Sequence, residues 1–281
     1  KAVYAYYYGA FAVYRMGKWR LASEVFQELQ TKHPGSDFAA QALFRSGEAI
    51  FNLAQGVSSA EKARIFHEAM EKYDTVLGKY PRSDWVDDAL YNKAWAIIHL
   101  SDIEDEYTRA DALPLFERIV AEHPGGDYGA ASQFTLGDYY YGAHQYDLAT
   151  ASYQKFLDTF PQESLKAKDR SLSRKARVLL GHLSEIEAYE VYAKGEALFD
   201  VQSYDEAIEI FADVIERFPE SSQAVNAVVN IASAYMAQEE YRKAAVEFQK
   251  VVAKYGENRR FSSQVDFSRQ QLQQLEEARV L

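Results

Sequence analysis

The segment LGDYYYGAHQYDLATASYQKFLDTFP, residues 136–161, contains the pattern that decides the fold. It ends at Pro161, an aromatic residue stands eight positions earlier at Tyr153, and an alanine stands four positions before that ring at Ala149. This pattern, A-x3-[FY]-x7-[PG], occurs six times, with alanines Ala22, Ala69, Ala112, Ala149, Ala207 and Ala244 and rings Phe26, Tyr73, Phe116, Tyr153, Phe211 and Phe248. Self-similarity at a nearly fixed period predicts an array of repeated structural units.

Each unit reads as two helices joined by a short turn. A small residue precedes the pattern in every unit, at Ala10, Gly47, Ala94, Gly137, Gly195 and Ala232. The breakers that close the units are 47, 43, 37, 58 and 37 residues apart, which is a 37-residue period with insertions. The small residue lets two helix backbones approach closely, and the ring fills the space beside it. We place the shorter insertions at residues 56–62 and 101–107.

This pattern resembles the tetratricopeptide repeat, whose signature is matched best by Leu136, Gly137, Tyr140, Ala149, Tyr153 and Pro161. The resemblance implies an all-α fold, a right-handed superhelix (α-solenoid) of about six helix pairs. The segments PGSDFAAQA, PRSDWVDDA, PGGDYGAAS and PESSQAVNA look like the repeats of bacterial envelope proteins, such as outer-membrane assembly lipoproteins and the coordinator proteins associated with the Tol-Pal system.

The repeats divide the chain into four predicted segments. Repeats one to four occupy residues 1–162, and repeats five and six occupy residues 184–258. Residues 163–183 form an inserted basic helical segment, either as an added helix or as an extension of the first helix of repeat five. Residues 259–281 have the pattern of a polar capping helix, with Phe261, Val265, Leu272 and Leu275 on its inner side.

Composition argues against several classes of function. The net charge of −11 opposes binding to nucleic acid, and no apolar stretch approaches the roughly 20 residues of a membrane helix. The sequence has no catalytic motif, no phosphate-binding glycine loop and no pair of histidines at metal-ligand spacing, and it contains no cysteine. We therefore predict no catalytic residue, no metal and no cofactor.

In tetratricopeptide folds the first helix of each pair lines a concave groove, so the resemblance implies a set of partner-binding residues. These are Tyr7, Phe11, Tyr14, Glu48, Phe51, Asn52, Asp88, Trp95, His99, Asp138, Tyr141, Glu196 and Phe199. Alternating aromatic and acidic side chains suit an extended segment with apolar residues and occasional lysine or arginine. The alternative is that several of these rings only pack between neighbouring helices.

Two surfaces stand apart from the groove. A basic cluster in an otherwise acidic chain is a candidate docking patch, or a solvated helix face, and consists of Lys166, Lys168, Arg170, Arg174, Lys175 and Arg177. The first segment, AVYAYYYGAFAVY, is apolar on every face, and we expect further chain or a partner to cover this N-terminal edge.

The sequence thus favours a noncatalytic scaffold that binds a protein segment or neighbouring subunits. The resemblance places it in the bacterial periplasm or on the periplasmic face of the outer membrane, although the composition also permits the cytoplasm. The alternative from another class is a helical arm that presents substrate to the catalytic domain of a larger enzyme.

Overall fold

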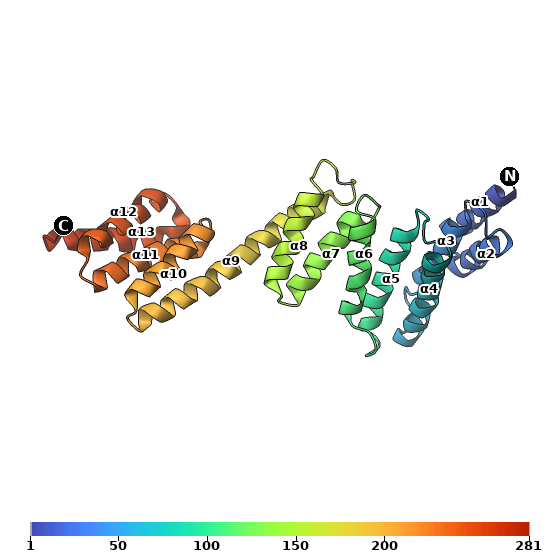
Figure 1. Ribbon diagram of the computed structural model, residues 1–281, viewed down its shortest axis with the longest axis horizontal. Helices are drawn as coiled ribbons and strands as arrows, with labels where there is room; N and C mark the ends of the chain where they lie inside the picture. The colour runs from blue at the N-terminus through green and yellow to red at the C-terminus, as the bar shows by residue number, and fades with distance from the viewer. Residues whose placement is uncertain (1, 281) are drawn as a thin grey trace. The chain divides into compact units, whose positions relative to one another are not determined.

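The computed structural model describes residues 2–280, and these residues form only helices and connecting turns (Figure 1). The all-α prediction is confirmed. Six helix pairs follow one another, and a last helix stands after them: α1 (Ala2–Arg15) with α2 (Trp19–Lys32), α3 (Ala39–Asn52) with α4 (Ser59–Lys79), α5 (Val86–Ser101) with α6 (Leu113–Glu122), α7 (Gly129–Gly142) with α8 (Tyr146–Thr159), α9 (Arg170–Asp200) with α10 (Tyr204–Arg217), α11 (Ser222–Ala237) with α12 (Tyr241–Tyr255), and then α13 (Ser262–Glu277).

The chain forms two compact units. Unit 1 ends at Arg177 and unit 2 begins at Val178, so the division falls inside α9. The predicted inserted segment is therefore not a separate helix, because its residues from Arg170 onward continue without a break into the first helix of the fifth pair. Lys1 and Leu281, the end residues of the first and last predicted segments, lie outside the described residues.

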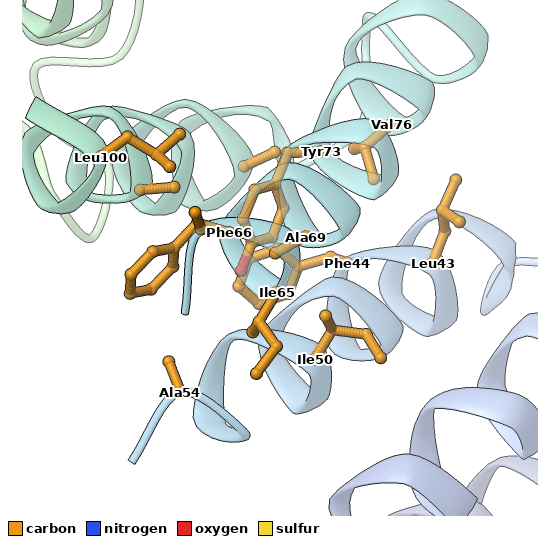
Figure 2. Packing of buried hydrophobic residues seen from close by; sticks show 13 residues of the cluster. Leu43, Phe44, Ile50, Ala54, Ile65, Phe66, Ala69, Tyr73, Val76 and Leu100 are labelled. Atoms are coloured by element: carbon orange, nitrogen blue, oxygen red, sulfur yellow. The ribbon is translucent and has the colours of Figure 1, made fainter. Parts of the chain in front are cut away.

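The repeated contact inside each pair is the one that the sequence predicts. All six pattern alanines and all six pattern rings are 0% exposed. In three pairs a glycine faces the ring: a Cβ atom added at Gly47 would lie 2.7 Å from Tyr73, and one at Gly137 would lie 2.6 Å from Tyr153. Only a residue without a side chain fits beside these rings. Figure 2 shows Tyr73 and Ala69 of α4 lying against α3 beside Phe44, in the core that extends to Leu100 of α5.

The tight turns between the two helices of a pair share one backbone feature. A residue with positive φ stands seven positions after the small residue in pairs one, four, five and six, at Gly17 (72°), His144 (58°), Gln202 (63°) and Glu239 (62°). This left-handed conformation reverses the chain in few residues and normally favours glycine. In the second and third pairs, longer loops replace this turn, and the loop before α6 includes the short 3-10 helix η1 (Arg109–Ala112).

The serines that precede the first helices differ in their roles. Ser221, which directly precedes α11, caps this helix by accepting a hydrogen bond from the Ala224 N–H at 3.2 Å. Ser36 and Ser83 do not cap the helices that follow them, because α3 and α5 each begin three residues later, after a turn. The sequence pattern missed Ser58, which caps α4.

The last helix, α13, packs on α11 and α12 of unit 2. Phe261, Val265 and Leu275 are buried, and the first two pack with Val225 and Val251. Phe261 belongs to the short 3-10 helix η2 (Arg259–Phe261) that leads into α13. Within residues 2–280, no helix has the length and hydrophobicity needed to cross a membrane.

Candidate functional site

The predicted groove residues all lie on the first helices of their pairs. Unit 1 holds those on α1 (Tyr7, Phe11, Tyr14), α3 (Glu48, Phe51, Asn52), α5 (Asp88, Trp95, His99) and α7 (Asp138, Tyr141), and unit 2 holds Glu196 and Phe199 on α9. The structure gives these residues different environments, and only some of them remain available to a ligand.

Tyr7 belongs to the core rather than to an open surface. Its side chain is 4% exposed, and its ring centroid lies 4.8 Å from that of Phe38 and 5.7 Å from that of Phe26. The Tyr7 ring therefore fills space between α1 and its neighbours, which is the packing role that the sequence analysis gave as the alternative.

Three other predicted rings pack on the aromatic residue that opens the second helix of their own pair. Tyr14 contacts Trp19 at 4.9 Å between ring centroids, and Phe199 contacts Tyr204 at 5.3 Å. Tyr141 contacts Tyr146 at 6.3 Å. All three rings stand four residues after the small residue, so this packing is a property of the repeat. The contact with the second helix accounts for the position of each ring without a ligand.

Asn52 connects neighbouring first helices. Its amide donates a hydrogen bond of 3.1 Å to the Tyr14 hydroxyl, and in unit 2 the Asn230 amide donates one of 2.8 Å to Tyr192 in the same way. Burial, together with the nearby Glu48, raises the pKa of Tyr14 to about 12. These groups satisfy one another, which favours a structural role.

Glu48 is also engaged within the protein. It accepts a hydrogen bond of 2.5 Å from Arg45, whose guanidinium lies 5.1 Å from the ring centroid of Trp85 and 5.9 Å from that of Phe11. Arg45 was not predicted from the repeat offsets, although it is the cation that holds this part of α3 against the aromatic residues around it.

The structure brings Phe51, Trp95 and His99 together. The His99 ring lies 5.7 Å from Phe51 and 6.3 Å from Trp95, and it stacks on Phe66 of α4 at 5.1 Å. Burial lowers the pKa of His99, which favours the neutral ring. Phe51, His99 and Phe66 also line a cavity of about 530 Å³.

Trp95 lines a second cavity, of about 610 Å³, that belongs entirely to unit 1. Its apolar wall comes from α5, α6, α7 and α9 and consists of Tyr91, Trp95, Ile98, Leu113, Phe116, Ala131, Phe134 and Leu172. Asp138 also lines it and accepts a hydrogen bond of 2.5 Å from Tyr153. Tyr139 lines this cavity and Tyr141 does not, so the ring that the offset rule selects on α7 is not the one beside Trp95.

Asp88 stands at the edge of an acidic region. Burial raises its pKa to about 7, and the neighbouring carboxylates Asp87 and Asp127 add to the shift. Asp87 itself accepts a hydrogen bond of 2.9 Å from the Asp127 N–H, which fixes the loop before α7. No hydrogen bond or ion pair involves the Asp88 carboxylate within the described residues, in contrast to Glu48 and Asp87.

All six residues of the predicted basic patch are exposed, and some of them also contact other residues of the protein. Lys166 forms an ion pair with Asp127, and the Lys168 ammonium lies 4.3 Å from the ring centroid of Tyr128. Lys175 lines the cavity beside Trp95. The remaining members, Arg170, Arg174 and Arg177, are exposed and follow one another at helical spacing on α9. These three have the arrangement of a solvated basic face, and the patch remains a candidate docking surface.

In unit 2, Glu196 is exposed and lies near the Tyr192 hydroxyl. Burial is the main reason why the pKa of Tyr192 is raised, and Glu196 adds to it. The described residues contain no cluster of three or more histidine, aspartate or glutamate side chains that could hold a metal ion.

Comparisons with known proteins identify the repeat. Residues 4–36 and residues 192–258 match two models of the tetratricopeptide repeat. A tetratricopeptide repeat protein from Parabacteroides merdae ATCC 43184 is similar in structure, with a TM-score of 0.44 and 17% identity over 95% of this chain and 98% of that one. The TPR2AB domain of yeast Sti1, solved in a complex with pHSP90, has a TM-score of 0.29 and 15% identity over 97% of this chain and 98% of that one. No curated protein matches the chain.

The two sequence matches lie one in each compact unit. The same contact between a small residue and a buried ring, with its 0% exposed alanine, recurs in the pairs between them. Residues 4–36 and residues 192–258 of the chain are tetratricopeptide repeats.

Proposed function

We propose that this protein is a noncatalytic scaffold that binds an extended segment of another protein against the first helices of unit 1. Tetratricopeptide repeats generally mediate protein–protein interaction. The observation that carries the proposal is the cavity of about 610 Å³ beside Trp95, whose wall is largely apolar and aromatic. Concave, mostly apolar sites with a few polar groups are typical of ligand-binding surfaces, and aromatic residues dominate the energetics of protein interfaces.

Site-specific crosslinking tests this proposal in the native cell. A photoreactive phenylalanine in place of Trp95 is expected to capture a partner protein, whereas the same residue in place of Leu148 is not. Leu148 is a matched control because it is 49% exposed and lies on α8, a second helix. Once the captured protein is purified, Trp95→Ala should weaken its binding by about 1 kcal/mol or more, roughly fivefold in Kd. Equal capture at both positions, or unchanged affinity in a folded Trp95→Ala variant, would refute the proposal.

We also propose that a helix covers the outer face of α1. Ala42 and Ala49 of α3 pack against Phe26 and Leu29 of the preceding α2, and Ala89 and Ala96 of α5 pack in the same way against α4. Ala5 and Ala12 occupy the corresponding positions of α1, but they are exposed. Tyr4 and Tyr8 nearby are 56% and 49% exposed. A photoreactive residue in place of Tyr8 should form a crosslink to a neighbouring helix. If the folded protein forms no crosslink at this position in native cells, the proposal of a covering helix is wrong.

The cellular site that we propose is the bacterial envelope, on the periplasmic side. This proposal rests on the resemblance of the segments that follow Pro34, Pro81, Pro124 and Pro219 to those of envelope proteins. Fractionation of native cells, with detection of the endogenous protein, tests it, and recovery in the cytoplasmic fraction would overturn it.

A further inference from the structure

Two stacked tyrosines mark a corner where α5, α7 and the start of α9 meet in unit 1. The Tyr91 ring of α5 and the Tyr128 ring, which precedes α7, have centroids 4.1 Å apart and planes only 18° from parallel. Tyr91 continues into the wall of the cavity that contains Trp95. The ring faces at this corner therefore adjoin an apolar space large enough for a side chain.

Asp169 lines the same space, and no group in the described part of the chain bonds to its carboxylate. The residue is 6% exposed and lines both the cavity of about 610 Å³ and a smaller one of about 250 Å³. Asp169 directly precedes α9, but its carboxylate does not cap this helix. The Leu172 N–H donates to the Asp169 backbone carbonyl, at 2.9 Å, and within residues 2–280 the carboxylate takes part in no hydrogen bond or ion pair. Burial raises the pKa of Asp169 in spite of two nearby lysines.

Those lysines are directed elsewhere. Lys166 pairs with Asp127 and also donates to the Gly126 carbonyl at 3.3 Å, while Lys168 lies over the Tyr128 ring. The charged groups at this corner are the carboxyl groups of Asp87, Asp88, Asp127 and Asp169 and the ammonium groups of Lys166 and Lys168. Arg45 and Glu48 also act on Asp88, but they form an ion pair with each other. The corner therefore has more carboxyl groups than cations, although the raised pKa of Asp88, about 7, leaves part of that carboxyl protonated near neutral pH.

The other cations that line the cavity do not offset this excess. Arg109 forms an ion pair of 3.0 Å with Asp102, outside the corner. Lys175 lies near Asp138, where burial raises the pKa of the carboxyl and the Lys175 charge partly opposes that shift, so Lys175 already has a carboxyl group beside it within the cavity. A buried carboxylate without a partner destabilises the folded protein, and a cation that reached it would relieve that cost.

We propose that this corner binds a lysine or arginine side chain of the partner segment, with its charged group at Asp169 and its stem along Tyr91. The proposal rests on the proposed function and specifies its partner. Aromatic faces attract cations, and the methylene stem of a basic side chain packs well on apolar surface. An apolar residue next to the basic one would occupy the cavity beside Trp95. The internal contact of Lys168 with Tyr128 shows that an ammonium group fits against one of these rings.

A phage-displayed library of random linear peptides, selected on the wild-type chain and on Asp169→Asn, tests this inference. Wild type should enrich peptides in which lysine or arginine stands beside a large apolar residue. Asp169→Asn should keep the apolar preference and lose the basic one. Asp147→Asn is the matched control, since Asp147 is exposed on the second helix α8, and it should keep both preferences.

Affinities of one selected peptide then test the pairing directly. Replacing its basic residue by norleucine should weaken binding to the wild-type chain by about tenfold or more, and should have little further effect on Asp169→Asn. The melting temperature of Asp169→Asn should be no lower than that of wild type, because the substitution removes a buried charge. This measurement serves as the control that the variant is folded.

The possible failures can be told apart. If wild type selects apolar peptides without a basic preference, or if Asp169→Asn keeps that preference, the inference is wrong and the proposed function stands. Enrichment of acidic peptides would also overturn it. If wild type selects no peptide at all, the proposed function fails together with it.

Discussion

Replacing Gly137 by alanine should destabilise the protein, although alanine is the better helix former. Gly137 lies in the middle of α7, where glycine costs about 1 kcal/mol relative to alanine. A Cβ atom at this position would lie 2.6 Å from the Tyr153 Cε1 atom, nearer than van der Waals contact allows. The helix and the ring must therefore move apart.

The magnitude follows from what holds the ring in place. Tyr153 is 0% exposed, and its hydroxyl donates a hydrogen bond of 2.5 Å to Asp138, so it has no free space to enter. Overpacking a core of this kind costs about 1–3 kcal/mol, and loss of the hydrogen bond adds about 1 kcal/mol. After the gain in helix propensity of about 1 kcal/mol, the expected net loss is about 1–3 kcal/mol.

Gly181→Ala provides the matched control. Gly181 is also in a helix interior, in α9, but a Cβ atom there meets nothing within 4 Å. This variant should be about 0.5–1 kcal/mol more stable than wild type. Guanidinium unfolding followed by circular dichroism measures both variants, with the slope of each transition as a check on cooperativity. Equal behaviour of Gly137→Ala and Gly181→Ala would refute the argument that contact between a small residue and a ring sets the repeat geometry.

Three further substitutions test separate parts of the structure. Because the pKa of Asp88 is raised to about 7, its carboxyl group stays protonated to higher pH in the folded state than in the unfolded state. The free energy of unfolding should therefore fall as pH rises from about 4 to 7. Asp88→Asn should therefore raise stability by about 1–2 kcal/mol at pH 8, after allowance for solvent screening, and much less at pH 4, as thermal unfolding at both pH values can show. Gln202→Gly should raise stability by about 0.5–1 kcal/mol because φ is 63° at this exposed turn residue, and an unchanged or lower melting temperature would contradict that reasoning. Ser221→Ala should lower stability by about 1 kcal/mol through loss of the α11 cap, because the Ala224 N–H would keep only its bond of 3.3 Å to the Ser221 carbonyl and should exchange its hydrogen faster. Ser222→Ala, at the next position, should leave the exchange rate of the Ala224 N–H unchanged.

The sequence predicts the features of this fold that depend on short spacings. The alanine at Ala149 and the ring at Tyr153 are one helical turn apart, so their shared burial follows from the pattern alone. The small residue at Gly137 is found in the same way, because it meets a ring of its own pair. Such contacts recur in each pair and reinforce one another along the chain.

The candidate site is less predictable, because it depends on which residues of different pairs meet. An offset rule selects Tyr141, but that ring packs on Tyr146, while Tyr139 lines the cavity. The role of Asp169 depends on the path of the loop before α9, which the repeat period does not determine. The insertion is visible as a change of spacing, yet its continuity with the following helix becomes clear only in three dimensions.

The location of the helix contacts has a consequence for how the molecule responds to tension. In the described part of each unit, the extensive contacts join elements that are neighbours or next neighbours along the chain. A pulling force can therefore detach a terminal hairpin without first breaking contacts between distant parts of the sequence. Each hairpin of about 37 residues would release roughly 12 nm of extended polypeptide, so a partner under load could be held while the chain lengthens in steps.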